Sequence, residues 1–289
     1  MKPVTAVLCC LAAIAMAPLW VSCTGVGGAR APQSATDFLG RGGMCLGAGW
    51  NAEAISDFDH AISLDPSLVD AYLGRGVANK RMGNYDGAIV DYDRAIALRP
   101  SYEDAFYNRG NARYCKADYD GALADFNRAI ELNPRNADAF NNRGLTKDIL
   151  GDFDGAKADY ERAIALNPND AYARFWLTLI LRREHAEESP AGLKDSKTAW
   201  NSGWSKNVGS FLLGRISETE LMTRARQGEA KDVQDQLNES YYYAGMSHLF
   251  QGDRKTAKEL FERSVATGKQ GFGEHDLAQA EIGRIARSP

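Results

Sequence analysis

The chain has 289 residues, of which 25% are charged and 44% are hydrophobic, the composition of an ordinary globular protein. This composition excludes a disordered chain and a collagen-like chain. Thirty-four basic residues against thirty-eight acidic residues leave a formal net charge of −4, so nucleic acid and other polyanions are not expected partners. Only nine prolines occur, which favours helices over a sandwich of short strands.

The first part of the chain has the features of an export signal. No charged residue lies between Lys2 and Arg30, and residues 4–17 form an apolar run of signal-peptide length. Cleavage after Ala17 is one alternative, and an uncleaved membrane anchor is another. The run Val21-Ser22-Cys23 resembles a bacterial lipobox, in which the cysteine receives the lipid. We predict a signal peptide over 1–22, a lipid anchor at Cys23 and a flexible tether over 23–34.

A period of 34 residues dominates the middle of the chain. Aligning four prolines at position 32 of the unit also aligns Gly at position 8, Ala at 20, an aromatic residue at 24 and Ala at 27. The prolines are Pro66, Pro100, Pro134 and Pro168. This pattern resembles the tetratricopeptide repeat, a helical hairpin. We predict an all-α protein with four repeats over 35–68, 69–102, 103–136 and 137–170, stacked as a right-handed solenoid with a concave side.

Two charged positions recur in every one of these four repeats. Position 7 is Arg and position 23 is Asp, and both charges are lost together in a later, divergent repeat. We predict that they pair between the helices, within a repeat or with its neighbour, against the alternative of separately solvated charges. The predicted pairs are Arg41 with Asp57, Arg75 with Asp91, Arg109 with Asp125, and Arg143 with Asp159.

The concave side is the expected place for a ligand. In this repeat class it is lined by positions 2, 5, 6, 9, 12 and 13 of the first helix, which in the third and fourth repeats supply amides and phenols. These side chains suit an extended peptide backbone, because an amide both donates and accepts. A merely soluble face is the alternative. The candidate groove residues are Tyr107, Asn108, Asn111, Tyr114, Asn141 and Asn142. Lys80 and Arg81 are the only basic groove residues, which disfavours a chaperone-type carboxylate clamp.

The period breaks after Pro168. We expect an interrupted helical segment over 171–237, a divergent fifth repeat over 238–271 and a capping helix over 272–289. Within the interrupted segment, Ser217 and Glu220 have the spacing of a capping box, in which each side chain bonds the other residue's amide. Apolar surface left by the broken stacking is an alternative site for a homodimer interface.

Several short segments after residue 171 carry a more specific resemblance. The runs 211–218, 237–239 and 272–275, behind an exported N-terminus and four repeats, resemble the NlpI family of bacterial outer-membrane lipoproteins. The resemblance implies a dimeric adaptor that holds murein endopeptidases and presents a hydrolase to a periplasmic protease. It also implies an outer-membrane anchor facing the periplasm, which Thr24 after the cysteine favours. A soluble periplasmic interaction protein of a secretion or polysaccharide assembly system is the alternative.

Catalytic chemistry is not expected. The four histidines, His60, His185, His248 and His275, show neither metal-ligand spacing nor a nucleophile signature, so we expect no metal, no cofactor and no enzymatic activity. The triplet Glu274-His275-Asp276 is the one alternative catalytic cluster. Cys45 and Cys115 lie two repeats apart, too far for a disulfide, and are expected to pack as small hydrophobic residues.

Overall fold

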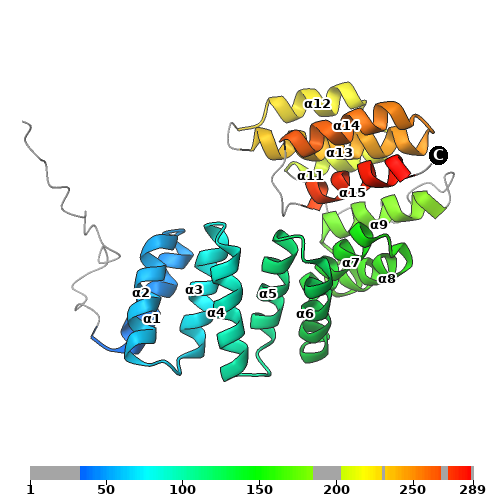
Figure 1. The fold of residues 1–289 in the computed structure, drawn as a ribbon. Helices are drawn as coiled ribbons and strands as arrows, with labels where there is room; N and C mark the ends of the chain where they lie inside the picture. Colours follow the sequence, from blue (N-terminus) through cyan, green and yellow to red (C-terminus); the bar gives the residue numbers. More distant parts are fainter. Residues whose placement is uncertain (1–32, 185–202, 230–231, 268–272, 288–289) are drawn as a thin grey trace, which may run out of the picture.

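In the computed structural model, which describes residues 33–184, 203–229, 232–267 and 273–287, all regular secondary structure is helical. Each predicted repeat contains one pair of antiparallel helices, and further helices follow (Figure 1). The helices are α1 (Ala35–Gly47), α2 (Asn51–Leu64), α3 (Val69–Arg81), α4 (Tyr85–Leu98), α5 (Glu103–Cys115), α6 (Tyr119–Leu132), α7 (Ala137–Leu150), α8 (Phe153–Leu166), α9 (Ala171–Glu184), α11 (Ser205–Leu212), α12 (Glu218–Arg226), α13 (Val233–Phe250), α14 (Arg254–Thr267) and α15 (Gly273–Arg287).

Short polar signals start the second helix of most repeats. The side chains of Asn84, Asp118 and Asp152 each accept a hydrogen bond from the backbone N–H three residues later, which caps the helix N-terminus. The turn before the cap needs a left-handed residue, which is glycine in three repeats. In the third repeat Ala117 takes this conformation with φ 59°, so the turn geometry persists without glycine.

The helices of a hairpin approach closely because small residues face aromatic rings. A Cβ built on Gly110 would lie 2.8 Å from Phe126, and one on Gly76 would lie 2.6 Å from the ring of Tyr92. The alanines at positions 20 and 27 are fully buried in all four repeats. The spacing of small and large residues, which recurs in all four repeats, therefore sets the distance between the two helices of each hairpin.

The four hairpins stand side by side in a row (Figure 1). The first helix of each repeat also contacts the first helix of the next, which places α1, α3, α5 and α7 along one side of the row. We call the surface formed by positions 2, 5, 6, 9, 12 and 13 of these helices the inner face. None of the helices in the described residues is long and apolar enough to cross a membrane.

All four predicted Arg–Asp pairs are present between the two helices of a hairpin. Arg109 binds Asp125 through Nε at 2.9 Å and Nη2 at 2.6 Å, and Arg143 binds Asp159 in the same manner. Each aspartate is buried, and each arginine lies over the aromatic ring at position 4. Bidentate bonding of a planar guanidinium fixes its orientation, so these pairs tie the hairpins together.

Three of these four arginines also bind the preceding repeat. Arg75 Nη1 lies 2.5 Å from Asp59 Oδ1, Arg109 Nη1 lies 2.5 Å from Asp93 Oδ1, and Arg143 Nη1 donates to Asn127 Oδ1 at 2.8 Å. The sequence left open whether pairing is within a repeat or between neighbours, and the structure shows both. One guanidinium thus joins three helices, because its fork offers five N–H donors.

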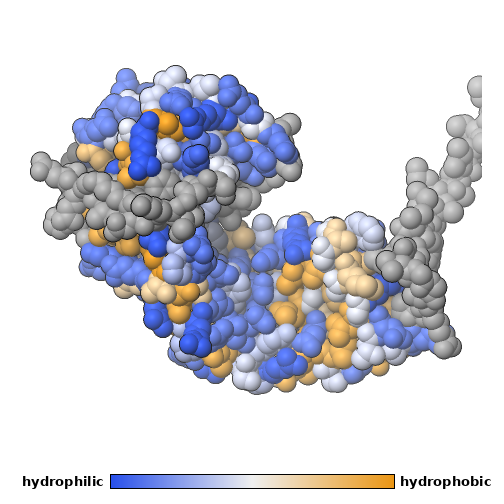
Figure 2. Space-filling model, turned by 180° about the vertical axis from the view of Figure 1, so that it is seen from behind, coloured by the Kyte–Doolittle hydropathy of each residue, from blue (hydrophilic) through white to orange (hydrophobic). Residues whose placement is uncertain are grey.

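The C-terminal helices form a second stack that rises from the α7–α9 end of the row (Figures 1 and 2). Helices α13 and α14 make a hairpin in which Gly245 faces Phe261, as in the regular repeats. Helix α15 packs on α13 and α14 and also reaches back to α7. The expected capping box is half formed: Ser217 Oγ accepts from the N–H of Glu220 at 3.2 Å, whereas the Glu220 side chain binds Arg224.

Candidate functional site

Helix α15 covers one end of the inner face. At its start, a Cβ on Gly273 would lie 2.9 Å from Trp176 and 3.3 Å from Leu145, so the helix begins in close contact with α7 and α9. Near its end, Arg284 donates to the backbone carbonyl of Asp148 on α7. The inner face is therefore closed by the chain's own C-terminal helix at the fourth repeat.

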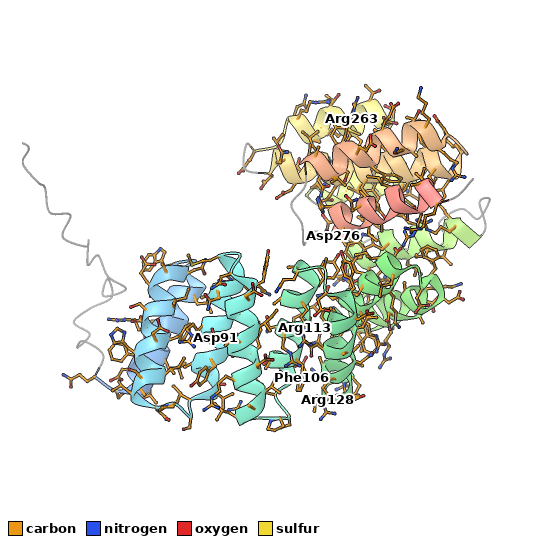
Figure 3. All side chains as sticks on the ribbon, viewed as in Figure 1. Asp91, Phe106, Arg113, Arg128, Arg263 and Asp276 are labelled. Carbon is orange, nitrogen blue, oxygen red and sulfur yellow. The ribbon has the colours of Figure 1, made fainter. Side chains whose placement is uncertain are left out.

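This contact corrects the assignment of Tyr114 to the groove. Its side chain is 7% exposed and belongs to the same apolar cluster as Leu145, Leu277 and Ala278. Burial raises the pKa of the Tyr114 phenol well above its ordinary value, and the nearby carboxylate of Asp276 adds to the shift. Tyr114 is a core residue of the α5–α15 contact, because α15 lies over it. Figure 3 shows Asp276 at the side of α15 that faces the repeats.

The remaining predicted groove residues stay partly exposed, and three of them form one hydrogen-bonded group. Asn142 Nδ2 donates to Asn111 Oδ1 at 2.8 Å and to the Tyr107 hydroxyl at 3.3 Å, which joins α7 to α5. Asn108 Nδ2 donates to the backbone carbonyl of Asp104 at 2.9 Å. Asn141 is half-buried, and its Oδ1 has no hydrogen-bond partner among the described residues.

These side chains are neutral hydrogen-bonding groups. Burial raises the pKa of the Tyr107 phenol, although the amides of Asn111 and Asn142 partly oppose the shift. The phenol therefore keeps its proton at neutral pH and can both donate and accept. A row of amides with one phenol, half-buried on rigid helices, can bind a peptide backbone but supplies no nucleophile or general base.

A buried ion cluster holds α15 in place. Glu281 is almost fully buried and binds both Arg183 of α9 and Arg284 of α15. The two guanidinium groups lie 4.7 Å and 4.8 Å from the ring centre of Phe153. Burial raises the pKa of neighbouring Asp148 to about 6, while both arginines oppose the shift. This cluster links α7, α8, α9 and α15. The sequence shows only its i,i+3 pair of Glu281 and Arg284, because Asp148, Phe153 and Arg183 come from helices far away along the chain.

Two further carboxyl groups lie among aromatic side chains, Glu274 buried and Glu239 half-buried. Glu239 accepts hydrogen bonds from the Tyr172 hydroxyl at 3.1 Å and from Trp204 Nε1 at 3.1 Å. Glu274 accepts from the Tyr243 hydroxyl at 3.0 Å. Burial raises the pKa of both carboxyl groups above the ordinary value. Their partners come from α9, α11 and α13, so they act as joints between the C-terminal helices.

The alternative catalytic triplet does not converge on a shared point. The Glu274 side chain accepts from Tyr243, whereas His275 Nδ1 lies 2.9 Å from Oδ1 of the next residue, Asp276. Among the described residues, no group of three or more His, Cys, Asp or Glu side chains is arranged to hold a metal ion. Neither Cys45 nor Cys115 forms a disulfide among the described residues. Cys23 and His185 lie outside the described residues.

Comparisons with known families and structures agree with this geometry. A model of the TPR repeat matches residues 80–116 and 110–147, and models of the tetratricopeptide repeat match residues 137–170 and 239–266. The chain carries tetratricopeptide repeats. The match at 239–266 falls on α13 and α14, which identifies this hairpin as a repeat despite its divergent sequence.

Solved structures show the same fold. A tetratricopeptide repeat protein from Parabacteroides merdae superposes with a TM-score of 0.58 at 18% identity, covering 87% of this chain and 100% of that one. The MamA protein gives a TM-score of 0.52 at 25% identity, covering 58% of this chain and 96% of that one. MamA of Desulfovibrio magneticus superposes with a TM-score of 0.51 at 21% identity, covering 55% of this chain and 90% of that one.

Proposed function

We propose that this protein is a non-catalytic adaptor that binds an extended segment of a partner protein along the inner face of α3, α5 and α7. The observation that carries the proposal is the half-buried group of Tyr107, Asn111 and Asn142, which joins two repeats and leaves amide and phenol edges at the surface. Stacked repeats offer such a surface without a conformational change, so little ordering entropy opposes binding.

The chemistry of this surface favours a peptide over a small molecule. An extended peptide presents alternating N–H and C=O groups, and each asparagine amide can pair with one of each. Tyr107 adds apolar area with a polar tip, the combination that is common at binding surfaces. Helix α15 limits the available length, because it covers the inner face at Tyr114 and Leu145.

The double variant Tyr107→Ala/Asn111→Ala tests this surface. We expect it to recover much less partner in a pull-down from envelope extracts, while the far-ultraviolet circular dichroism remains that of the wild type. The control is Arg128→Ala/Glu131→Ala, which removes an exposed ion pair from α6, away from the inner face. Equal partner recovery by both double variants would place the binding surface elsewhere.

We further propose that the protein works at the bacterial cell envelope, anchored to the outer membrane through a lipid on Cys23 and facing the periplasm. The apolar run of residues 4–17 and the lipobox-like Val21-Ser22-Cys23 support this proposal. Cys23→Ser should leave the precursor unprocessed and the protein outside the outer-membrane fraction. Normal processing and fractionation of that variant would overturn the anchor.

The resemblance to the NlpI family supports murein endopeptidases and a periplasmic processing protease as the partners, and a homodimer as the assembly. Crosslinking in cells followed by mass spectrometry tests the partners. Recovery of those hydrolases supports this role, whereas subunits of a secretion or polysaccharide assembly system would support the alternative of a soluble periplasmic interaction protein. Murein digestion by the purified protein alone would overturn the non-catalytic role.

A further inference from the structure

Two cations on the inner face lack an acidic partner, unlike the other cations on the first helices. Of the Lys and Arg side chains on α1, α3, α5 and α7, every one except Lys80 and Arg81 forms an ion pair with an aspartate. The paired residues are Arg41, Arg75, Arg109, Arg113, Arg143 and Lys147. Neither Lys80 nor Arg81 has a carboxylate within 4.0 Å among the described residues.

Lys80 is held towards the amide row described above. Its Nζ lies 3.5 Å from Oδ1 of Asn108 on α5, at the long limit of a hydrogen bond. Its side chain is half-buried. Burial lowers the pKa of the Lys80 amine, the nearby Cys115 opposes the shift, and the positive charge of Arg81 adds to it. Keeping an ammonium partly out of water without a counter-charge is unfavourable, so an anion bound here would relieve that cost.

The next residue places a second charge at the same end of α3. Arg81 is exposed, and its Nη1 donates to the backbone carbonyl of Leu46 on α1 at 2.6 Å. This bond fixes the guanidinium between the first two repeats and leaves its other N–H groups available. Lys80 and Arg81 therefore stand together in the last turn of α3, on the second repeat.

Helix α1, which lies next to α3, leaves space for the backbone of a bound partner segment. A Cβ built on Gly43 or Gly47 of α1 would meet no atom within 4 Å, and both glycines are exposed. Glycine permits a close approach of another backbone to the helix. An extended segment can thus pass over α1 and reach Lys80 and Arg81 before it meets Asn108 and Tyr107.

The acidic side chains near this place are already engaged or face other groups. Asp86 binds Lys116, and Asp70 lies 3.5 Å from Arg99 and accepts from the Tyr102 hydroxyl. Asp276 of α15 lies 2.9 Å from the His275 ring. None of them neutralises the two cations, so the local charge is complementary to an anionic ligand.

We propose that Lys80 and Arg81 form an anion-binding subsite at the end of the peptide surface, and that the partner places a peptide carboxylate there. One half-buried ammonium beside neutral amides matches a single negative charge, and the exposed guanidinium can bind the second carboxylate oxygen. The carboxylate belongs either to an Asp or Glu side chain or to the C-terminus of the partner. This inference rests on the proposed function and specifies the chemistry of the partner.

A peptide library measures this preference directly. The full-length protein is titrated by fluorescence polarisation with a positional-scanning library of acetylated, amidated peptides and with the same library carrying free C-termini. We expect enrichment of Asp and Glu at one position of the amidated library, or a gain in affinity from the free C-terminus. Either preference should weaken with added salt, since the subsite is partly exposed.

Lys80→Gln and Arg81→Gln assign the preference to the subsite. We expect each variant to lose it by about tenfold, the loss expected for one charge-assisted contact. Lys80→Arg should retain it, and Lys80→Glu should select Lys or Arg at the same position. The matched control is Lys116→Gln, which removes an equal charge that is already paired with Asp86.

The outcomes separate this inference from the proposed function. If peptides bind and Tyr107→Ala/Asn111→Ala abolishes binding, but the library shows no acidic preference, the subsite is wrong and the peptide surface stands. An acidic preference that persists in Lys80→Gln and Arg81→Gln also overturns the subsite. If no peptide in either library binds, both proposals fail.

Discussion

The four regular repeats and the C-terminal helices bury charged side chains in contrasting ways. In the repeats, each buried aspartate is bound by an arginine 16 residues earlier in the same hairpin. In the C-terminal region, Glu281 binds Arg183, which lies 98 residues away. The charge pairs of the repeats each need only the two helices of one hairpin. The pair of Glu281 and Arg183, by contrast, makes the position of α15 depend on α9.

The two regions also differ in the donors that bind their carboxyl groups. The aspartates of the repeats meet guanidinium forks, while Glu239 and Glu274 meet Tyr and Trp donors within an aromatic core. A repeat array stabilised by local terms can lose one pair and keep its fold. A contact made by one carboxyl group and one or two buried donors is more sensitive, because removing the carboxyl group leaves those donors without a hydrogen bond.

The largest expected loss of stability is at the ion cluster of Glu281, Arg183 and Arg284, which holds α15. Glu281→Ala leaves the half-buried guanidinium group of Arg183 without its carboxylate and removes one of the carboxylates beside Arg284, so the free energy of unfolding should fall by about 3–5 kcal/mol. Urea denaturation measures the loss, and hydrogen exchange should increase in α15 before it increases in α1–α4. Glu131→Ala, which breaks an exposed pair, is the control and should change stability by less than about 1 kcal/mol.

A pH dependence follows from the same ion cluster. Burial raises the pKa of Asp148 from 3.8 to about 6 in the folded state, so the folded protein binds this proton more tightly than the unfolded chain. The contribution of Asp148 to stability therefore falls as pH rises through this range, by on the order of 3 kcal/mol. Asp148→Asn should remove that fall. Urea denaturation between pH 3.8 and about 6 measures how the free energy of unfolding changes with pH. The control is Asp154→Asn, an exposed position, which should keep the pH dependence of the wild type.

Two aspartates that bind the same arginine should contribute unequally to stability. Asp125 and Asp93 both bind Arg109, but the Asp125 side chain is 3% exposed and that of Asp93 is 52% exposed. We expect Asp125→Ala to cost about 1.5–3 kcal/mol, because it removes charge-assisted bonds from a buried place. Asp93→Ala should cost less than about 1 kcal/mol. Equal losses in thermal unfolding would contradict this ranking.

Two glycines of the first helices should respond with opposite signs. Gly110→Ala forces a Cβ against Phe126 at 2.8 Å and should destabilise the protein by about 1–3 kcal/mol. Gly43→Ala meets open space and should stabilise it by about 0.5–1 kcal/mol, since alanine favours a helix. Differential scanning calorimetry of both variants distinguishes packing from helix propensity.

The sequence by itself determined the hairpins and their charge pairs. Position 8 glycine, position 24 aromatic and the Arg–Asp spacing of 16 residues recur within each unit, so a local pattern fixes both the close approach and the partner. The turn after the first helix also keeps its left-handed residue in each of the four repeats, although in the third it is Ala117 and not glycine. These features depend only on residues within one hairpin, and the four copies repeat the same information.

Only the tertiary structure decided which part of the inner face is available. Tyr114 occupies a groove position in the repeat pattern, yet α15 buries it through contacts with residues more than 150 positions later. No local pattern marks α15 as a helix that folds back to α7, because the contact depends on burying Leu277 and pairing Glu281 rather than on periodicity. The second partners of Arg75, Arg109 and Arg143 likewise depend on how neighbouring hairpins stack, as does the lack of an ion pair at Lys80 among the described residues.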